Sequence, residues 1–371
     1  MRIAFHTPLN LFEDARISGD RRMAHQLVEA MAGLGHRVEP ILNARTYMRQ
    51  PDPEALIWHL CEAQARRDAL LAEWRRDGTA PELWFTYHSY YKAPDLLGPQ
   101  LSQQLGIPYI IAEGSDSERR AAGEWAEHVA LARRSFGLAD LHVYFTARDR
   151  QSVEPWRGPH APLLWLPPFI RSVPPAAART SGTGSPRLLT IAMMRPGKLG
   201  SYRALAAALT PLLDEPWSLT IIGDGQMRAE VEAAFAGIPA DRLRWLGAIG
   251  HEAVKAELAT HDVFFWPGVR EAYGLVYLEA QATGLAVLAF DSGGVSATVK
   301  AGETALLVPD GDMPALTAAL ARLLKEPGLR QRMGEAARGF VATERTLERA
   351  TGTIATALEL AVSSHAARMA S

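Results

Sequence analysis

The stretch from residue 262 to residue 294 constrains the fold of this chain more than any other. Asp262 to Trp266 is a short apolar run that predicts a buried strand, and a Pro-Gly pair ends it. Leu275 to Ala282 has helical periodicity, and Ala286 to Phe290 is a second apolar run. Strand, helix and strand in this order predict a βαβ unit, in which a crossover helix joins two parallel strands. We therefore expect an α/β fold with a parallel sheet.

Two carboxylates mark the start of the predicted helix. Glu271 precedes the helix and Glu279 lies two turns inside it, which separates them by roughly 12 Å or less. Between them, the N–H groups of Tyr273, Gly274 and Leu275 lie at a helix N-terminus, where anions bind favourably. Gly274 has no side chain to keep a phosphate from the backbone. An anion site between two hydroxyl acceptors fits a nucleotide-sugar, although an ordinary helix with an acidic start is the alternative.

The residues around this helix carry a family resemblance. Glu271-Ala-Tyr-Gly-Leu-Val-Tyr-Leu-Glu279, followed by Ser292-Gly293-Gly294, resembles the retaining glycosyltransferases of family 4. The resemblance implies the GT-B fold, with two doubly wound Rossmann-like domains facing each other across a cleft. It also implies that Glu271 contacts the donor sugar, that Glu279 contacts the ribose, and that Gly293 belongs to the donor site.

The length of 371 residues predicts two domains. We expect an N-terminal, acceptor-side domain over residues 1–170 and a nucleotide-sugar-binding domain over 188–345. Residues 171–187 are rich in Pro, Gly and Ser, which is typical of a domain linker. A C-terminal helix over 346–371 can cross back to the first domain in GT-B proteins.

Composition excludes several classes of function. A hydrophobic share of 48% and a net charge of −2 are typical of a soluble globular protein and do not favour nucleic-acid binding. The one cysteine, Cys61, excludes a disulfide framework. The sequence starts directly with a predicted strand, and no apolar run is long enough to span a membrane. We expect a cytoplasmic protein with at most peripheral membrane contact.

Three candidate residues lie in the first domain. Gly19 opens a helix after the first strand, and the resemblance implies that its loop faces the donor diphosphate. His88 and Glu113 each end a predicted strand, and the carboxyl ends of parallel strands face the ligand crevice. A structural histidine and a surface acid are the alternatives for these two residues.

Glu113 departs from the family pattern, which ends this strand in His-Gly beside the transferred sugar. The chain has Glu113-Gly114 instead, which leaves the identity of the sugar and the transfer itself open. A carboxylate at this position can accept hydrogen bonds from sugar hydroxyls or stabilise positive charge at the anomeric carbon.

The second domain supplies the cations. The resemblance implies that Arg195 and Lys198 neutralise the donor diphosphate, although a typical member spaces this pair more widely; two exposed cations on a turn are the alternative. It also places Gly223 in a donor-binding segment and the backbone around Gly247 at the base. No carboxylate pair is placed to hold a divalent ion on the diphosphate, so we expect no metal and no cofactor.

These features together predict a retaining, metal-independent transferase. It would move a sugar from a nucleoside diphosphate sugar, with a UDP-sugar favoured, to a small-molecule, glycan or lipid-linked acceptor. The departing phosphate oxygen would take the acceptor's proton. A nucleotide-sugar epimerase and a catalytically inactive nucleotide-sugar-binding protein are the alternatives.

Several helices outside the motif are also predicted. Periodicity indicates helices over residues 54–76, 94–105, 120–134 and 346–362, and a frayed tail after residue 363.

Overall fold

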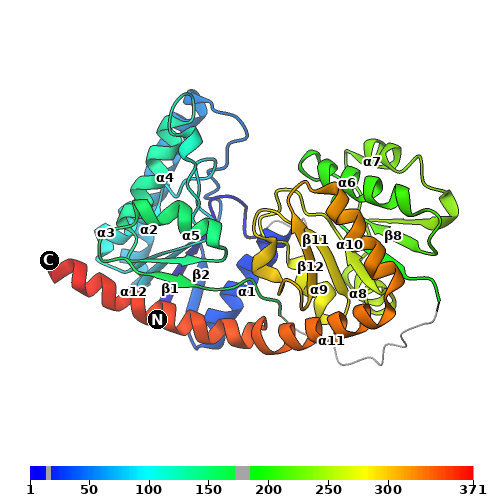
Figure 1. The fold of residues 1–371 in the computed structure, drawn as a ribbon. Helices are drawn as coiled ribbons and strands as arrows, with labels where there is room; N and C mark the ends of the chain where they lie inside the picture. The colour runs from blue at the N-terminus through cyan, green and yellow to red at the C-terminus, as the bar shows by residue number, and fades with distance from the viewer. Residues whose placement is uncertain (14–17, 172–183, 371) are drawn as a thin grey trace. The chain divides into compact units, whose positions relative to one another are not determined.

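The computed structural model describes residues 1–13, 18–171 and 184–370 (Figure 1). The chain forms two compact units. Unit 1 combines Met1–Pro167 with Leu347–Ser371, and unit 2 is Pro168–Thr346. Residues 172–183, most of the predicted linker, lie outside the described residues.

Unit 1 is built on a six-stranded parallel sheet with the order β2-β1-β3-β4-β5-β6. Its strands are β1 (Arg2–His6), β2 (Arg37–Pro40), β3 (Leu83–Tyr87), β4 (Tyr109–Ala112), β5 (Leu141–Tyr144) and β6 (Leu163–Trp165). Its α-helices are α1 (Gly19–Gly33), α2 (Pro53–Asp77), α3 (Gly98–Leu105), α4 (Ala126–Leu138), α5 (Ala147–Val153) and α12 (Leu347–Ala370). Helices α2, α3 and α4 share a core with Trp84 and Tyr109, and α1 packs against α12 (Figure 1).

Unit 2 repeats this architecture with the order β12-β11-β10-β7-β8-β9. Its strands are β7 (Arg187–Ile191), β8 (Ser218–Ile222), β9 (Leu243–Gly247), β10 (Val263–Phe265), β11 (Ala286–Asp291) and β12 (Ala305–Pro309). Its α-helices are α6 (Leu199–Leu209), α7 (Arg228–Ala234), α8 (His251–Thr260), α9 (Leu275–Ala282), α10 (Met313–Lys325) and α11 (Pro327–Glu344). The predicted α/β class with two doubly wound sheets is confirmed.

The strand order places the functional loops. In unit 1 the order reverses between β1 and β3, and in unit 2 it reverses between β7 and β10. The crossover helices leave such a point in opposite directions, so the loops at the carboxyl ends of the two strands form a crevice. The strands β3, β10 and nearly all of β11 are buried, because helices cover both faces of a parallel sheet. Each sheet therefore presents two converging loops on a rigid core.

The C-terminal helix corrects one prediction. Helix α12 continues to Ala370 instead of fraying after residue 363. The Ser364 hydroxyl donates to the carbonyl of His160 at 2.7 Å, and Arg368 Nε donates to the buried Asp140 carboxylate at 2.7 Å. These side-chain contacts anchor the end of α12 in unit 1. None of the described helices combines the length and hydropathy needed to span a bilayer.

Three other helices differ from their predicted ranges. Helix α3 begins at Gly98 rather than at residue 94; its N-cap is Leu97, and the Asp95 side chain before it accepts from Gly98 N at 2.8 Å. The helix predicted over 120–134 is observed as α4, which begins only at Ala126. Gly123 has a left-handed φ of 82°, which interrupts a helix that would start at residue 120. Helix α11 was not predicted.

Asp95 is the centre of a buried polar network beneath the carboxyl ends of β1 and β3. Its carboxylate accepts from Thr86 Oγ1 at 2.5 Å and Tyr109 Oη at 2.8 Å, and it lies 3.1 Å from His6 Nδ1. Burial opposes ionisation, but His6 and the hydroxyl donors outweigh it and hold the pKa of Asp95 well below its usual range. Asp95 therefore remains a carboxylate in the core and ties three strands together.

We predict that Asp95→Asn lowers the free energy of unfolding by about 3–5 kcal/mol, because it leaves buried donors and His6 without their anionic partner. The loss of stability should also appear in the wild type as pH falls. A lowered pKa contributes stability that is full above the unfolded carboxyl pKa of about 3.9 and is lost progressively as pH falls from there toward the lower pKa of the folded state. Urea unfolding between pH 3 and pH 7 measures both effects.

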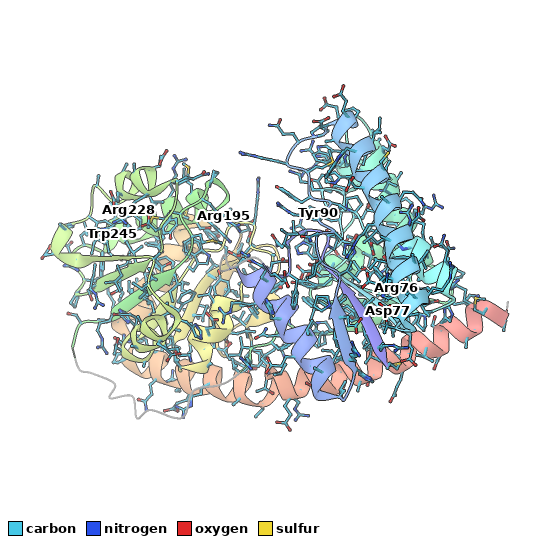
Figure 2. All side chains as sticks on the ribbon, turned by 180° about the vertical axis from the view of Figure 1, so that it is seen from behind. Arg76, Asp77, Tyr90, Arg195, Arg228 and Trp245 are labelled. Atoms are coloured by element: carbon cyan, nitrogen blue, oxygen red, sulfur yellow. The ribbon has the colours of Figure 1, made fainter. Side chains whose placement is uncertain are left out.

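Asp77→Asn is the matched control in the same unit. Asp77 is exposed, and among the described residues it pairs with its neighbour Arg76 at the end of α2, where Figure 2 labels both residues. Removing such a surface pair should leave the unfolding midpoint unchanged. Equal effects of the two substitutions would show that the Asp95 network does not stabilise the core.

Candidate active site

The loop between β10 and α9 contains the first predicted glutamate. The Glu271 carboxylate forms an ion pair with Lys198, which follows β7, and Oε2 of Glu271 also accepts from Trp266 Nε1 at 3.2 Å. The side chains of Lys198 and Glu271 are 12% and 14% exposed. The structure thus joins two predicted site residues directly, at the point where the strand order of unit 2 reverses.

The glycine turn after β11 holds this loop in place. Gly294 N donates to the carbonyl of Glu271 at 3.0 Å, and Arg270 N donates to Ser292 Oγ at 2.9 Å. Gly293 has a φ of +66°, and a Cβ at this position would lie 1.9 Å from the Glu271 carbonyl oxygen. Only glycine permits this backbone approach, so Gly293 positions Glu271 through the main chain.

Gly274 forms the N-cap of α9 with a left-handed φ of 78°, and no side chain caps this helix. An added Cβ would lie 2.8 Å from the ring of Tyr277, so packing alone requires glycine here. The side chains of Tyr273 and Leu275 are buried, and these residues can face a ligand only through the backbone. The N-terminus of α9 keeps the geometry of an anion site.

Glu279 lies on α9 after Glu271, as predicted from the spacing. Its side chain is half-buried, with the Oε1 atom fully covered. The predicted contact with a ribose stays a prediction.

Glycines also join the loops after β7, β8 and β9. Gly223 N donates to the carbonyl of Gly247 at 2.8 Å. A Cβ on Gly223, whose φ is +149°, would lie 1.9 Å from the carbonyl oxygen of Ala192. Arg195 stands on the loop after β7 and is exposed, unlike Lys198 (Figure 2). The two predicted cations therefore differ: Lys198 is held by Glu271, and Arg195 faces solvent.

Unit 1 contains a separate cluster of three side chains. His88 Nδ1 lies 2.5 Å from Asp20 Oδ1 and 3.8 Å from Glu113 Oε1. His88 follows β3, Glu113 follows β4, and Asp20 follows Gly19 in the first turn of α1. His88 and Glu113 have φ values of 61° and 54°, in the left-handed region that non-glycine residues rarely adopt. The sheet therefore brings the two predicted residues together, with Asp20 as a third partner.

Charge interactions decide the protonation of this cluster. Burial lowers the pKa of His88, but the carboxylates of Glu113 and Asp20 outweigh it and raise the pKa to about 9. Burial raises the pKa of Glu113 to about 8, although His88 opposes the shift. Burial also opposes the ionisation of Asp20, but His88, Asn10 and Tyr87 together outweigh it and lower the pKa of Asp20. The neighbouring carboxylates therefore favour the protonated form of His88.

The role expected for Glu113 in the transfer stays a prediction. Glu113 is not a surface acid, because its side chain is 7% exposed.

The cluster has a metal-compatible donor set. One ligand atom from each of Asp20, His88 and Glu113 lies within 4.8 Å of the others, and a nitrogen with two carboxylate oxygens can bind zinc. His88 Nδ1 lies 2.5 Å from Asp20 Oδ1, so this nitrogen can serve either the contact with Asp20 or a metal ion, if it is the ligand atom. The expectation of no metal stays a prediction.

Sequence analysis missed two residues of these sites. Asp20 directly follows Gly19, and its acidic side chain in the first turn of a helix was the available signal. Trp266 was assigned to a strand, although its indole N–H contacts Glu271. Gly19 itself is exposed, and a Cβ on it would meet no atom within 4 Å, so packing among the described residues does not require glycine there.

We predict that Gly293→Ala lowers the melting temperature and displaces Glu271, because the new Cβ overlaps the Glu271 carbonyl oxygen. Gly302→Ala is the matched control, since Gly302 has a similar φ of +79° but no atom within 4 Å of an added Cβ. The left-handed backbone costs both variants about 1–2 kcal/mol. Only Gly293→Ala should also lose donor binding in calorimetry; equal losses would show that the contact with Glu271 is unimportant.

Comparisons with known proteins agree with this geometry. The family model of glycosyl transferases group 1 matches residues 183–340. A GDP-mannose-dependent alpha-(1-6)-phosphatidylinositol monomannoside mannosyltransferase of Mycolicibacterium smegmatis is 31% identical over 263 residues, which cover 66% of this chain and 68% of that protein. A D-inositol 3-phosphate glycosyltransferase of Streptomyces avermitilis is 27% identical over 84% of this chain and 76% of its own length.

Other relatives are matched over shorter parts, from 21% to 43% of their own length. Sucrose-phosphate synthase from Thermosynechococcus elongatus has the same fold, with a TM-score of 0.72, 20% identity, and coverage of 96% of this chain and 97% of that one. The predicted GT-B fold and family are thereby confirmed, and the chain belongs to the group 1 glycosyl transferases.

Proposed function

We propose that this glycosyltransferase moves a sugar from a nucleoside diphosphate sugar to an acceptor with retention of configuration and without a metal ion. The bond between the anomeric carbon and the diphosphate oxygen breaks, and a bond from the same carbon to an acceptor oxygen forms on the same face. The acceptor's proton passes to the departing diphosphate. The step is balanced without a protein base.

The single observation that carries the proposal is the Lys198–Glu271 ion pair beside the N-terminus of α9. It places a cation, a carboxylate and the positive end of a helix dipole at one reversal point of the sheet. The phosphates of a nucleotide-sugar need the cation and the helix dipole, and its sugar hydroxyls need the carboxylate as a hydrogen-bond acceptor. Arg195 and Lys198 are spaced more closely than in a typical family member, which favoured a protein that has lost catalysis. Because Lys198 still reaches Glu271, this spacing no longer favours that alternative.

The donor's charge is the main problem that the site has to solve. Negative charge grows on the diphosphate as the glycosidic bond breaks, and groups that stabilise it only then raise the rate. Arg195 is exposed on the same loop as Lys198 and can approach a bound diphosphate. Two cations and the α9 dipole, worth about half a charge, compare with a divalent ion.

Relatives indicate which donors and acceptors to test. The Mycolicibacterium smegmatis relative is named for GDP-mannose and a phosphatidylinositol mannoside, and the Streptomyces avermitilis relative for inositol 3-phosphate. We favour a UDP-sugar as donor, and GDP-mannose is the competing candidate. A thermal-shift panel of both nucleotide-sugar classes separates them.

We predict full activity in excess EDTA and a product with the donor's anomeric configuration. The charge on the diphosphate is balanced by Arg195, Lys198 and the helix dipole, so a chelator removes nothing that the reaction needs. Product NMR reports the configuration, and turnover with and without EDTA reports the metal. Activity that EDTA abolishes and magnesium restores would refute the metal-free site, and an inverted product would refute the proposed mechanism.

We also predict that Arg195→Ala lowers kcat by about 10²–10³-fold and changes donor affinity less, because the cation matters most in the transition state. Arg203→Ala is the control, since Arg203 is an exposed arginine of the adjacent helix α6. Steady-state kinetics report kcat, and donor titrations report the affinity for the donor. If Arg195→Ala weakens only donor binding, the residue binds the ground state and transition state equally.

A further inference from the structure

Helix α2 buries only one of its faces. The inner face is formed by four buried residues at the spacing of an amphipathic helix, namely Leu56, Ala63, Leu70 and Trp74. The opposite face carries two large apolar side chains, Ile57 and Trp58, which are 62% and 58% exposed. Among the described residues, only Met369 near the end of the chain is a more exposed large hydrophobic side chain. Contiguous exposed apolar side chains mark interaction sites more often than single ones do.

Smaller side chains continue this patch along the helix. They follow Trp58 at steps of three or four residues, which keeps them on one side of the helix, and all are exposed: Cys61, Ala65, Ala69 and Ala72. We call these residues, together with Ile57 and Trp58, the outer face of α2. This face is bulky at its N-terminal end and flat toward its C-terminal end. It is therefore complementary in shape to a second copy of itself that runs in the opposite direction.

The two ends of the outer face carry opposite charges. Glu54 lies in the first turn of α2, and Arg75 and Arg76 lie in the last turn, where Figure 2 labels Arg76. All three residues are exposed. Arg76 forms an ion pair with Asp77 of the same helix, but its side chain is 72% exposed and keeps donors toward solvent. An antiparallel copy of α2 would place a basic end beside each acidic end.

We propose that the outer face of α2 is the interface of a homodimer, in which the helices of two copies pack antiparallel about a twofold axis at Ala65. This axis places Cys61 of one copy opposite Ala69 of the other, and Trp58 opposite Ala72. Each indole then covers an alanine-lined stretch of the second helix. Glu54 of each copy lies opposite Arg76 of the other, because both are eleven positions from Ala65.

Other occupants of this face fit its charges less well. Parallel packing of two copies would place each charged end beside an end of the same sign, which is unfavourable. An anionic lipid surface attracts helices with an excess of lysine and arginine. Helix α2 has five acidic residues and four arginines, so it carries no such excess. Charge complementarity therefore selects a second copy in the antiparallel direction.

The length of α2 indicates how strong the dimer is. A helix of 25 residues is about 37 Å long, and one pair of such helices forms an interface at the small end of the specific range. We therefore expect a dissociation constant in the micromolar range. Sedimentation velocity of the full chain over a concentration series measures this constant.

Trp58→Ala tests the apolar part of the interface. A buried tryptophan is a typical centre of binding energy, so its truncation should raise the dissociation constant of the dimer by about tenfold or more. The residue is exposed in one copy, so the melting temperature at low protein concentration should stay unchanged. Val362→Ala is the control, since Val362 is an exposed apolar residue of α12 and should leave the dimer intact.

Charge reversal tests the direction of packing. Glu54→Lys places a lysine opposite Arg76 of the other copy, and Arg76→Glu places a glutamate opposite Glu54, so each variant alone should dimerise at least threefold more weakly than wild type. An equimolar mixture of the two variants restores both attractive pairs in a mixed dimer. Its dissociation constant should return to the wild-type value, which no parallel arrangement allows.

Crosslinking tests the position of the axis. A short bismaleimide should join two copies of Ala69→Cys, because position 69 lies opposite Cys61 of the other copy. The wild type has one cysteine, and the two copies of Cys61 would lie roughly 12 Å apart along the pair, so it should crosslink poorly. Ala236→Cys, an exposed position in unit 2, is the control and should behave like wild type.

Four outcomes would overturn the inference. A wild type that stays monomeric at every concentration would exclude the dimer. A dimer that Trp58→Ala does not weaken would use another surface. A mixture of the two charge variants that associates no better than either alone would exclude antiparallel packing. Monomeric wild type that binds phosphatidylglycerol vesicles, with binding lost in Trp58→Ala, would assign the outer face to a membrane surface.

Discussion

The ion pair between Lys198 and Glu271 is the contact on which the candidate site of unit 2 depends. Strand β10 lies beside β7 although residues 192–262 separate them, because β8 and β9 extend the sheet in the other direction. The loops after β7 and β10 consequently meet, and they bring opposite charges. At 12% and 14% exposure, neither side chain would be stable there without the other. The same pairing fixes both groups before a substrate arrives.

Close backbone contacts make this arrangement rigid. The turn at Gly293 rests on the Glu271 carbonyl, and Gly223 rests on the carbonyl of Ala192. Each contact joins loops from different strands without any side chain, so the charged groups are held by the main chain itself. Preorganised dipoles and charges need no rearrangement during the reaction, which is how such groups lower a barrier. The glycines of this site therefore act through geometry.

Local patterns in the sequence predicted helix α9 and the positions of the two glutamates, whereas Arg195 and Lys198 were implied by the family resemblance. Helix α9 occupies Leu275–Ala282 as periodicity predicted, and the two glutamates are set by spacing along one segment. The cluster of unit 1 depends on distant segments: Asp20 and His88 are 68 positions apart, and no short pattern relates them. The anchored end of α12 is also a tertiary effect, because Asp140 supplies the partner for Arg368. Helix α11 was missed because Gly334 weakens its helical pattern, yet Gly334 is needed where a Cβ would lie 2.2 Å from the carbonyl of Gly284.

The two units hold buried charges with different sets of partners. In unit 2 Lys198 pairs with one carboxylate, Glu271, beside the N-terminus of α9. In unit 1 His88 lies beside Asp20 and beside Glu113, the acid that departs from the family pattern, and both raise the pKa of His88 against the effect of burial. A histidine in place of Glu113 would put a second imidazole beside the first and lower the pKa of both. The exchange of that residue for glutamate therefore favours a protonated His88, and it changes which hydrogen bonds the first unit can offer to a substrate.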